Sequence, residues 1–334
     1  MKIIAPIASI MELRTMIEYG VDEVYCGFQF HSDHQSILVN RRPNVSANLK
    51  NIEELHDAVE IAHSKGAKLS ITINSLYYTK NQYSYIVKMV EAAITAGVNA
   101  VIVSDLALIL FLRENYPDLR LHLSTTSSVF NSESIKFFEE LGLKRIILPR
   151  HLTIGEILKI KEKSTIDLEV FIFGQRCMND DGQCTWEHGL ENFAGEGIYS
   201  GTGCYMNYKF KAFAKNSKTN SLKSLERNYT MEWLAPRYCG FCPLFDFVKA
   251  GIKYFKIPGR EEMSPQHRIE WAKAVNGIRK ILENFPDDRD KYHTIAKEFY
   301  KQFFKSSCFK THCYYPAWEE EERELWNKPS LSPR

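Results

Sequence analysis

One local pattern recurs five times along the 334 residues. A segment with helical spacing ends at a glycine, and an apolar stretch follows within one or two residues. Glycine ends a helix readily because it adopts the left-handed backbone conformation at little cost. The pattern therefore predicts repeated helix-to-strand connections, which are typical of α/β folds. The five glycines are Gly20, Gly66, Gly97, Gly142 and Gly251.

Eight strand-sized apolar runs accompany these glycines. The runs are continuous rather than alternating, which indicates parallel strands buried on both faces beneath helices. A doubly wound sheet would show a similar alternation, but the count of eight and the lack of an early glycine-rich phosphate loop favour a (β/α)8 TIM-like barrel, regular or irregular. The predicted strands are Ile3–Ile7, Val24–Phe28, Leu69–Ile73, Val101–Ser104, Leu119–Leu123, Arg145–Leu148, Leu168–Phe173 and Tyr254–Ile257.

The predicted domain boundaries lie where the alternation of helices and strands is interrupted. We expect a barrel over residues 1–260, with an insertion at 174–241, between the seventh and eighth strands, that carries a cysteine cluster. Residues 261–334 are predicted to form a C-terminal helical extension and tail. In this extension Ile269, Ala272, Val275 and Ile278 have the spacing of one helix face.

The net charge and the hydropathy of the chain limit which kinds of binding partner can be expected. The 43 Lys and Arg residues nearly balance the 41 Asp and Glu residues, so composition alone gives no electrostatic drive toward nucleic acid or an acidic membrane. The N-terminus has no convincing signal peptide, and the apolar runs are too short to span a membrane. We therefore expect a cytoplasmic protein, in which clustered cysteines are more often metal ligands or redox groups than disulfides.

The eight cysteines are unevenly spaced, and five of them fall between residues 177 and 242. Thiolates from separate loops at a barrel mouth suit a tetrahedral metal or an iron–sulfur cluster. Only Cys239 and Cys242 form a tight pair, so the dispersed set favours iron–sulfur over zinc, and unrelated cysteines are the third alternative. Cys26, within a strand, is expected to pack in the core. No role follows for Cys308 and Cys313.

Reactive groups of such a barrel lie at the C-terminal ends of its strands. Candidate catalytic groups there are Asn74, Asp105, His151 and Glu261. Three arginines follow the last three strands, and arginine binds carboxylate or phosphate in two-point geometry. We expect them to bind a small dicarboxylate or a nucleic-acid phosphate, or else to form salt bridges. The candidate substrate-binding residues are Arg150, Arg176, Arg260, Ser124 and Thr125.

An ordered set of motifs resembles the family named peptidase U32. Ile4–Ser9 is similar to its opening L-L-A-P-A-G-S, and Ile17–Tyr25 is similar to its A-I-x-x-G-A-D-A-V-Y. The pair Cys177 and Cys184 and the segment Ala250–Arg260 follow in the expected order. The resemblance covers about residues 1–285 and is carried by the order of the motifs rather than by one of them.

The resemblance implies a function and a cofactor. Members of the family act in oxygen-independent hydroxylation of tRNA, ribosomal RNA or the ubiquinone ring, with prephenate implicated as hydroxyl source. They carry a [4Fe–4S] cluster on four cysteines, which correspond by position to Cys177, Cys184, Cys204 and Cys239, with Cys242 as an alternate. The short type can pair with a second homologous subunit.

Two other function classes compete with this one. The family's early label was collagenase-like protease, so a metal-dependent peptidase is one alternative, although no G-x-S-x-G or H-E-x-x-H motif occurs. A non-catalytic subunit with a structural cluster or zinc is the other. The expected function is an iron–sulfur protein that hydroxylates a nucleic-acid base or a quinone-like ring.

Overall fold

A computed structural model describes most of the chain. The described residues are 1–30, 39–40, 42, 47–174, 176–177, 180–184, 208–215, 222–229, 238–260, 264–309 and 312–315. The chain divides into two units, one formed by residues 1–184 with 236–334 and the other by residues 185–235. Two of the predicted site residues, Cys204 and Glu261, lie outside the described residues.

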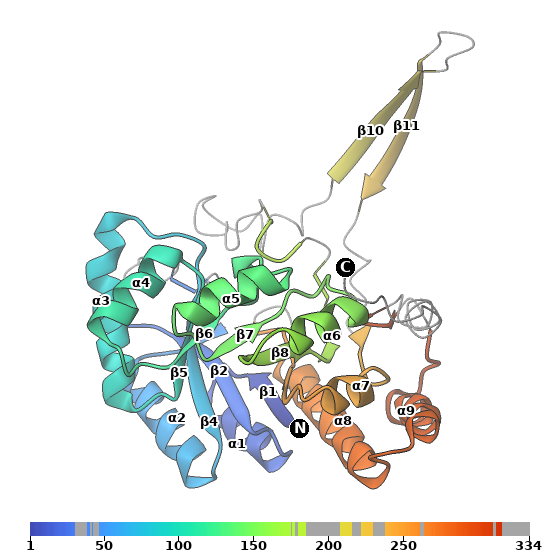
Figure 1. Ribbon diagram of the computed structural model, residues 1–334, viewed down its shortest axis with the longest axis horizontal. Coiled ribbons are helices and arrows are strands. Elements are labelled where there is room, and N and C mark those ends of the chain that lie inside the picture. The colour runs from blue at the N-terminus through green and yellow to red at the C-terminus, as the bar shows by residue number, and fades with distance from the viewer. Residues whose placement is uncertain are drawn as a thin grey trace, which may run out of the picture. The chain divides into compact units, whose positions relative to one another are not determined.

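Eight parallel strands form a closed barrel in the first unit, which confirms the predicted fold (Figure 1). The sheet closes because β1 pairs with β13 on one side and with β2 on the other. In spatial order the strands are β1 (Lys2–Pro6), β13 (Tyr254–Lys256), β8 (Asp167–Phe171), β7 (Arg145–Ile147), β6 (Leu121–Leu123), β5 (Ala100–Val103), β4 (Lys68–Ile73) and β2 (Glu23–Phe28).

Helices connect these strands and cover the outside of the barrel, as the alternation of the sequence predicts (Figure 1). Their inward faces are apolar, and α2 buries Leu55, Ala58, Val59 and Ala62 at helical spacing. The helices up to the last strand are α1 (Ile10–Glu18), α2 (Ile52–Ser64), α3 (Lys80–Ala96), α4 (Leu106–Asn115), the short 3₁₀ helix η3 (Thr125–Ser127), α5 (Ser132–Glu140), α6 (Ile154–Glu162) and α7 (Leu244–Lys249).

The five glycines that predict the helix-to-strand connections all have positive φ, between 72° and 85°. These values lie in the left-handed region that glycine adopts without a steric penalty. The start of α6 is confirmed as well, since Thr153 and Glu156 form a reciprocal capping box. Local sequence signals therefore fix the ends of the elements.

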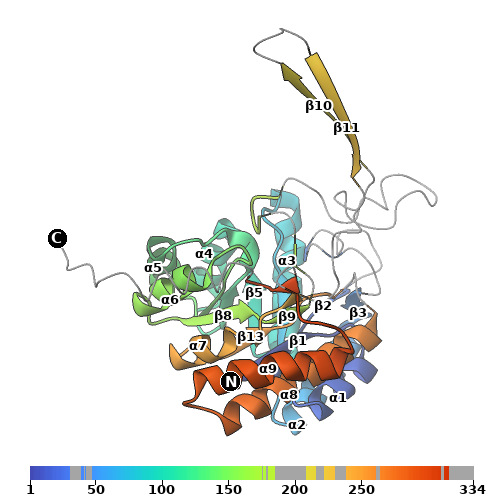
Figure 2. The same ribbon diagram turned by 90° about the vertical axis from the view of Figure 1, so that its right-hand side faces the viewer.

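Two further helices follow β13. They are α8 (Pro265–Asn284), which begins with Ser264 as its N-cap, and α9 (Arg289–Phe304). α8 contacts β1 and α1, and Figure 2 shows α9 running beside it. The apolar face predicted from spacing is confirmed, because Ala272, Val275 and Ile278 are fully buried.

The predicted strand Leu168–Phe173 is interrupted in the structure. β8 ends at Phe171, and β9 (Phe173–Gly174) pairs antiparallel with β12 (Tyr238–Cys239) instead of continuing in the barrel. Between them, the backbone of Ile172 accepts a hydrogen bond from Gly240 N at 2.7 Å. The chain thus leaves the barrel here and meets the segment that carries Cys239. A further short strand, β3 (Asn48–Leu49), pairs with β2.

The described part of the second unit is an antiparallel hairpin. β10 (Tyr208–Lys215) pairs with β11 (Leu222–Tyr229) over eight residues on each strand. The sequence predicted an insertion at this place but no hairpin within it. Among the described residues of the whole chain, no helix combines the length and the apolar character that crossing a membrane requires.

Candidate functional site

Hydroxyl and amide groups gather where β4, β5 and β6 end. Asn74 Nδ2 donates to Ser124 Oγ at 3.1 Å, and Ser104 Oγ lies 2.5 Å from Thr126 Oγ1. The Oδ1 atom of Asn74 is buried and has no partner among the described residues. A buried carbonyl oxygen without a partner is costly, so this atom is a candidate acceptor for a bound ligand. Thr125 Oγ1 donates to the carbonyl of Leu148 at 3.3 Å.

Asp105 has a structural task in this arrangement. Its carboxylate accepts from the Leu108 backbone N at 2.6 Å as the N-cap of α4, and from Tyr83 Oη at 3.1 Å. Side chains of this kind at an N-cap satisfy backbone donors that have no partner within the helix. Both hydrogen bonds go to Oδ1 of Asp105, which gives this carboxylate a structural role at the start of α4.

Arg150 follows β7 and holds a second segment at the mouth. Its Nε and Nη2 atoms donate to the two carboxylate oxygens of Asp181 at 3.0 and 2.5 Å, and its backbone N donates to Asp181 as well. Burial alone would lower the pKa of Arg150, but the Asp181 carboxylate more than offsets it and keeps that pKa above its ordinary value. Burial would raise the pKa of Asp181, and Arg150 turns this into a net lowering. The pair is a fixed two-point clamp.

The clamp fixes the turn that precedes Cys184. Gly182 in this turn has φ +79°, and a Cβ atom there would lie 2.1 Å from Ser128 Oγ, so only glycine fits this close approach. Ser128 Oγ in turn donates to the carbonyl of Asp181 at 3.5 Å. Cys177 is close enough to Arg150 to contribute to its electrostatic environment. The turn at Asp181 and Gly182 is thereby held at the end of β7.

His151 and Arg176 lie in the same part of the mouth. His151 Nε2 is 3.6 Å from Asp180 Oδ1, while its Nδ1 is buried and has no partner among the described residues. Burial lowers the pKa of His151, and the positive charges of Arg150 and Arg176 act in the same direction, whereas Asp181 and Asp180 oppose them. The imidazole is therefore held in its neutral form, which can accept a proton.

Arg260 lies elsewhere, on the β2 and β4 side of the barrel. Its Nη1 donates to Thr72 Oγ1 at 2.8 Å and its Nη2 to the carbonyl of Asn40 at 3.2 Å. The backbone of Gly27 lies so close that a Cβ atom would come within 2.0 Å of the amides of Asn40 and Asn48. The contacts of the described residues thus gather Arg150 and Arg176 in one sector and place Arg260 in another.

A buried pair positions the backbone of Arg260. Arg268 on α8 donates through Nε and Nη2 to the carboxylate of Glu12 on α1, at 2.5 and 2.9 Å. Its Nη1 donates to the carbonyls of Gly259 and Arg260 at 3.1 and 2.7 Å. This link between α1, α8 and the end of the last strand was not predicted, because a Glu and an Arg 256 positions apart leave no spacing signal.

The barrel interior contains a second network that the sequence did not indicate. Arg145 donates to both carboxylate oxygens of Glu23, at 3.1 and 2.9 Å, and to Glu169 at 2.9 Å. Lys256 donates to the other oxygen of Glu169 at 2.7 Å, and Ser70 Oγ donates to Glu23 at 2.9 Å. Burial would raise the pKa of Glu169, but Lys256 and Arg145 bring about a net lowering. Two cations and two anions thus balance inside the sheet.

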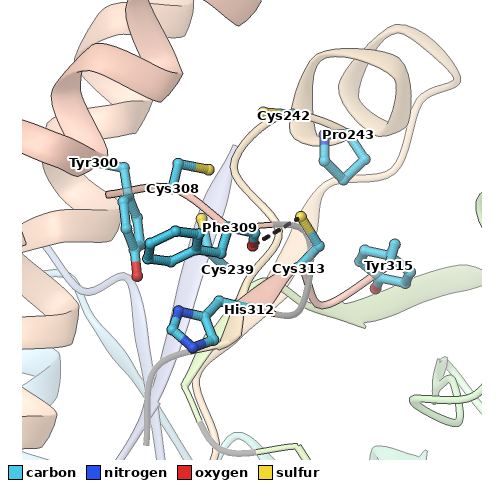
Figure 3. A pocket seen from close by; sticks show the side chains of 9 residues that line it. All are labelled: Cys239, Cys242, Pro243, Tyr300, Cys308, Phe309, His312, Cys313 and Tyr315. Carbon is cyan, nitrogen blue, oxygen red and sulfur yellow. Dashed lines mark hydrogen bonds between the residues drawn. The ribbon is translucent and has the colours of Figure 1, made fainter. Parts of the chain in front are cut away.

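Four cysteines meet in a cavity beside β12, which we call the cysteine pocket (Figure 3). It joins the tight pair of the insertion to the two cysteines for which the sequence gave no role. Burial, and then the neighbouring Cys242, raises the pKa of Cys239 well above its ordinary value. The lining residues are Cys239, Cys242, Pro243, Tyr300, Cys308, Phe309, His312, Cys313 and Tyr315.

The predicted cluster ligands are only partly brought together in the part of the chain that the structure describes. Cys177 and Cys184 lie on the clamped segment, Cys239 lines the cysteine pocket with Cys242, and Cys204 is outside the described residues. Within the described ranges, no group of three or more His, Cys, Asp or Glu side chains stands in an arrangement that would hold a metal ion. The ligand set stays a prediction.

Comparison with known proteins gives the family. A model described as Peptidase family U32 matches residues 8–324. The chain is 33% identical over 184 residues to tRNA hydroxylation protein P of Haemophilus influenzae, which covers 55% of this chain and 38% of that protein. It is 26% identical over 306 residues to tRNA hydroxylation protein P1 of Bacillus subtilis, which covers 91% and 68%.

A third relative acts on ribosomal RNA according to its name. The chain is 26% identical over 313 residues to the 23S rRNA 5-hydroxycytidine synthase of Escherichia coli, which covers 93% of this chain and 44% of that protein. The chain thus spans less than half the length of two of these three relatives. Since the family model matches nearly the whole chain, barrel and C-terminal helices included, this chain belongs to peptidase family U32.

Proposed function

We propose that this chain takes part in oxygen-independent hydroxylation of an RNA base, with a [4Fe–4S] cluster held by Cys177, Cys184, Cys204 and Cys239. The observation that carries the proposal is the Arg150–Asp181 clamp. A buried two-point ion pair fixes Asp181, three residues before Cys184, at the C-terminal end of β7, and strand ends are where barrels of this kind carry out chemistry. The names of the relatives supply the substrate class.

The backbone positions of two of the cysteines support an iron–sulfur cluster. Cys177 follows β9 by three residues, and β9 pairs with the strand that contains Cys239, so both cysteines come from neighbouring backbone. Four thiolates are the usual ligands of such a cluster, and Cys242 is the alternate fourth ligand. When bound, the cluster would supply one-electron redox chemistry at the mouth.

The chain's own residues would bind and orient the other reactants. Asp181 occupies the fork of Arg150, so we assign binding of a small dicarboxylate, such as prephenate, to Arg176, Ser124 and Thr125 in this part of the mouth. Arg260 donates to Thr72 and Asn40 in another sector and stays a separate candidate. The buried Asn74 Oδ1 would accept a hydrogen bond from the bound molecule. Neutral His151 would take up a proton at its Nδ1 or Nε2 atom.

Local positive charge in the hairpin of the second unit would attract RNA. β10 and β11 together contain four lysines and one arginine but only one glutamate, although the whole chain has a formal net charge of only +2. Basic residues attract phosphate irrespective of sequence. We place the reaction in the cytoplasm, because thiolate ligands persist in a reducing compartment. A second homologous subunit would co-purify with the chain, which pull-down of the tagged protein tests.

Anaerobic purification tests the cofactor. We expect a brown protein with about four irons and four sulfides per chain, and loss of both in the Cys177→Ala variant. A colourless protein that contains no iron after anaerobic expression in iron-supplemented medium would overturn the cluster. The Cys26→Ala variant is the control for iron content, because Cys26 is fully buried in β2 and belongs to no proposed ligand set.

Nucleoside mass spectrometry tests the reaction. Total tRNA and ribosomal RNA from cells with and without the gene should differ by one nucleoside that carries one additional oxygen atom. Complementation with the Cys177→Ala variant should leave that nucleoside absent. Identical nucleoside profiles, together with peptide hydrolysis that does not respond to Cys177→Ala, would instead favour the protease reading of the family's name.

A further inference from the structure

Seven large apolar side chains are exposed in the part of the chain that the structure describes. Five of them lie on the helices that cover the barrel, and Phe309 lies in the C-terminal segment. The seventh is Tyr77, which is 68% exposed and lies on the loop of residues 74–79 between β4 and α3. Its position distinguishes it from the others, because the loops that follow barrel strands carry the substrate contacts of such folds.

The residue next to Tyr77 fixes this loop. Tyr78 Oη donates to the carbonyl of Val39 at 2.7 Å and accepts a hydrogen bond from the backbone N of Ser75 at 3.0 Å. The same backbone N also donates to the Val39 carbonyl, at 3.2 Å. The backbone of the loop is therefore held while the Tyr77 ring stays exposed. A molecule that stacks on this ring would lose little free energy in ordering the loop.

The loop begins with a buried acceptor. Asn74 Nδ2 donates to Ser124 Oγ at the end of β6 at 3.1 Å, while Asn74 Oδ1 is buried and has no partner among the described residues. A buried carbonyl oxygen costs free energy until a donor reaches it. The bases of RNA present ring N–H groups and exocyclic amines, whereas an ionised carboxylate presents only acceptors. Of the proposed reactants, the base therefore suits Asn74 best.

Positive charge lies at the other end of the loop. Lys80 is the first residue of α3 and is exposed, and the first turn of this helix contains no acidic residue. The N-terminus of a helix carries partial positive charge, so a lysine there is unfavourable by itself and strengthens a positive potential. A phosphate group would be attracted both by the lysine and by the end of the helix.

We propose that this loop recognises the RNA at the mouth of the barrel. Tyr77 stacks on the nucleotide that flanks the modified base, Lys80 contacts the phosphate, and Asn74 Oδ1 accepts a hydrogen bond from an N–H group of the modified base. The three residues from Asn74 to Tyr77 span at most about 10 Å, so both can contact adjacent nucleotides of one strand.

The chemistry of base modification explains why an aromatic ring is needed here. An enzyme that modifies a base has to take it out of the stack, which removes a stacking partner from the flanking nucleotide. The Tyr77 ring replaces that partner, and stacking on an aromatic side chain tolerates any base. This inference rests on the proposed function, which supplies RNA as the substrate class.

RNA binding of the full chain tests the role of the ring. The anaerobically purified protein is titrated against fluorescein-labelled total tRNA, and separately ribosomal RNA, from cells without the gene, and anisotropy is measured. Tyr77→Ala should bind at least about fivefold more weakly, whereas Tyr77→Phe, which keeps the ring, should stay within about twofold of the wild type. Phe137→Ala removes an exposed aromatic side chain from α5 and is the matched control.

The other two residues have separate readouts. Lys80→Ala should lower the slope of log affinity against log salt concentration by about one, whereas the exposed Lys88→Ala on the same helix should not. Asn74→Ala should bind RNA with unchanged affinity, yet cells complemented with it should lack the nucleoside that carries an additional oxygen atom. Circular dichroism shows that each variant folds.

Ultraviolet cross-linking locates the contact. Trypsin cleaves after Lys68 and Lys80, so residues 69–80 form one peptide, which should carry a nucleotide adduct in the wild type and lose it in Tyr77→Ala. The proposal is overturned if folded Tyr77→Ala binds RNA as the wild type does, if Tyr77→Phe binds as weakly as Tyr77→Ala, or if adducts map only to other peptides. These outcomes leave the proposed function standing, whereas a wild-type chain that binds neither RNA overturns both.

Discussion

The barrel interior and the cysteine pocket are two buried places that are completed in opposite ways. In the interior, Arg145 and Lys256 balance Glu23 and Glu169. Glu169 pairs with both strands beside β8, and Arg145 also pairs with Glu23 on β2, which is not a neighbour of β7. The cysteine pocket instead gathers four groups of the same kind, which repel one another once ionised. The contrast shows that the fold neutralises buried charge in the first place by pairing opposite charges, whereas in the second place burial raises the pKa of Cys239 and so favours its neutral thiol.

The largest effect is expected from breaking the interior network. Glu169→Ala leaves Arg145 and Lys256 buried with one fewer partner, and we expect a loss of about 3–5 kcal/mol in the free energy of unfolding. Urea denaturation followed by circular dichroism measures it. Lys136→Ala breaks only the exposed pair with Glu133 and should change stability by less than about 0.5 kcal/mol. Equal effects of the two variants would contradict the importance of the interior network.

The Arg150–Asp181 clamp should come next in size. Asp181→Ala leaves a largely buried guanidinium without its carboxylate, which is expected to cost about 1–3 kcal/mol. If the clamp also positions Cys177 and Cys184, iron content after anaerobic purification should fall as well. Asp180→Ala removes an exposed neighbouring carboxylate and serves as control. Normal iron content in a folded Asp181→Ala protein would show that the clamp does not organise the cluster.

Lowering the pH should destabilise the folded protein through the buried His122. Burial, and then the charge of Arg145, lowers the pKa of His122 well below its ordinary value. The unfolded chain binds the proton below about pH 6.5 and the folded chain does not, so stability falls as pH falls, by up to about 1.4 kcal/mol per pH unit. In urea titrations between about pH 5 and 7, His122→Gln should flatten this slope, whereas the exposed His56→Gln should not. If the free energy of unfolding of His122→Gln depended on pH more steeply than that of the wild-type protein, the pH dependence could not be assigned to His122.

The smallest effect should come from the border of the cysteine pocket. Tyr315→Phe removes one hydrogen bond to Phe171 and is expected to cost about 0.5–1.5 kcal/mol. Because this bond ties the C-terminal segment to the barrel, Cys313 should react faster with iodoacetamide in metal-free protein. Tyr77→Phe, on an exposed tyrosine, is the control. If Tyr315→Phe lowered the free energy of unfolding as much as Glu169→Ala, the border of the cysteine pocket would contribute as much to stability as the interior network.

The same contrast explains how much of the fold the sequence could predict. The eight strands are continuous apolar runs and the five glycines end helices. Local signals therefore predict the barrel and the order of its strands and helices along the chain. Glu23, Arg145 and Glu169 escaped notice because each is a single charged residue at the edge or middle of an apolar run. Their pairing depends on which strands are neighbours, as for Arg145 and Glu169, and on which strands lie opposite each other in the closed barrel, as for Arg145 and Glu23, and this information exists only once the sheet has closed.

The candidate site was predictable to a smaller extent. Arg150, His151, Ser124 and Asn74 follow the ends of their strands, a position that topology determines, and their roles in binding or catalysis stay predictions. It did not reveal that Asp105 caps α4. The connection of Cys313 to Cys239 was beyond prediction, since it depends on the path of α8 and α9, which spacing does not encode.

The closure of the barrel has a consequence for how the chain is made. In the sheet, residue 2 lies opposite residue 254, so the first strand has to wait for the last one to leave the ribosome. Until then, β1 and β8 have unpaired edges, which are prone to misassociation. The inserted segment between β8 and β13 lengthens this wait in time, yet adds little to the entropy of closure, which grows only with the logarithm of loop length. Synthesis rate and chaperones, rather than final stability, should therefore limit the yield of this protein.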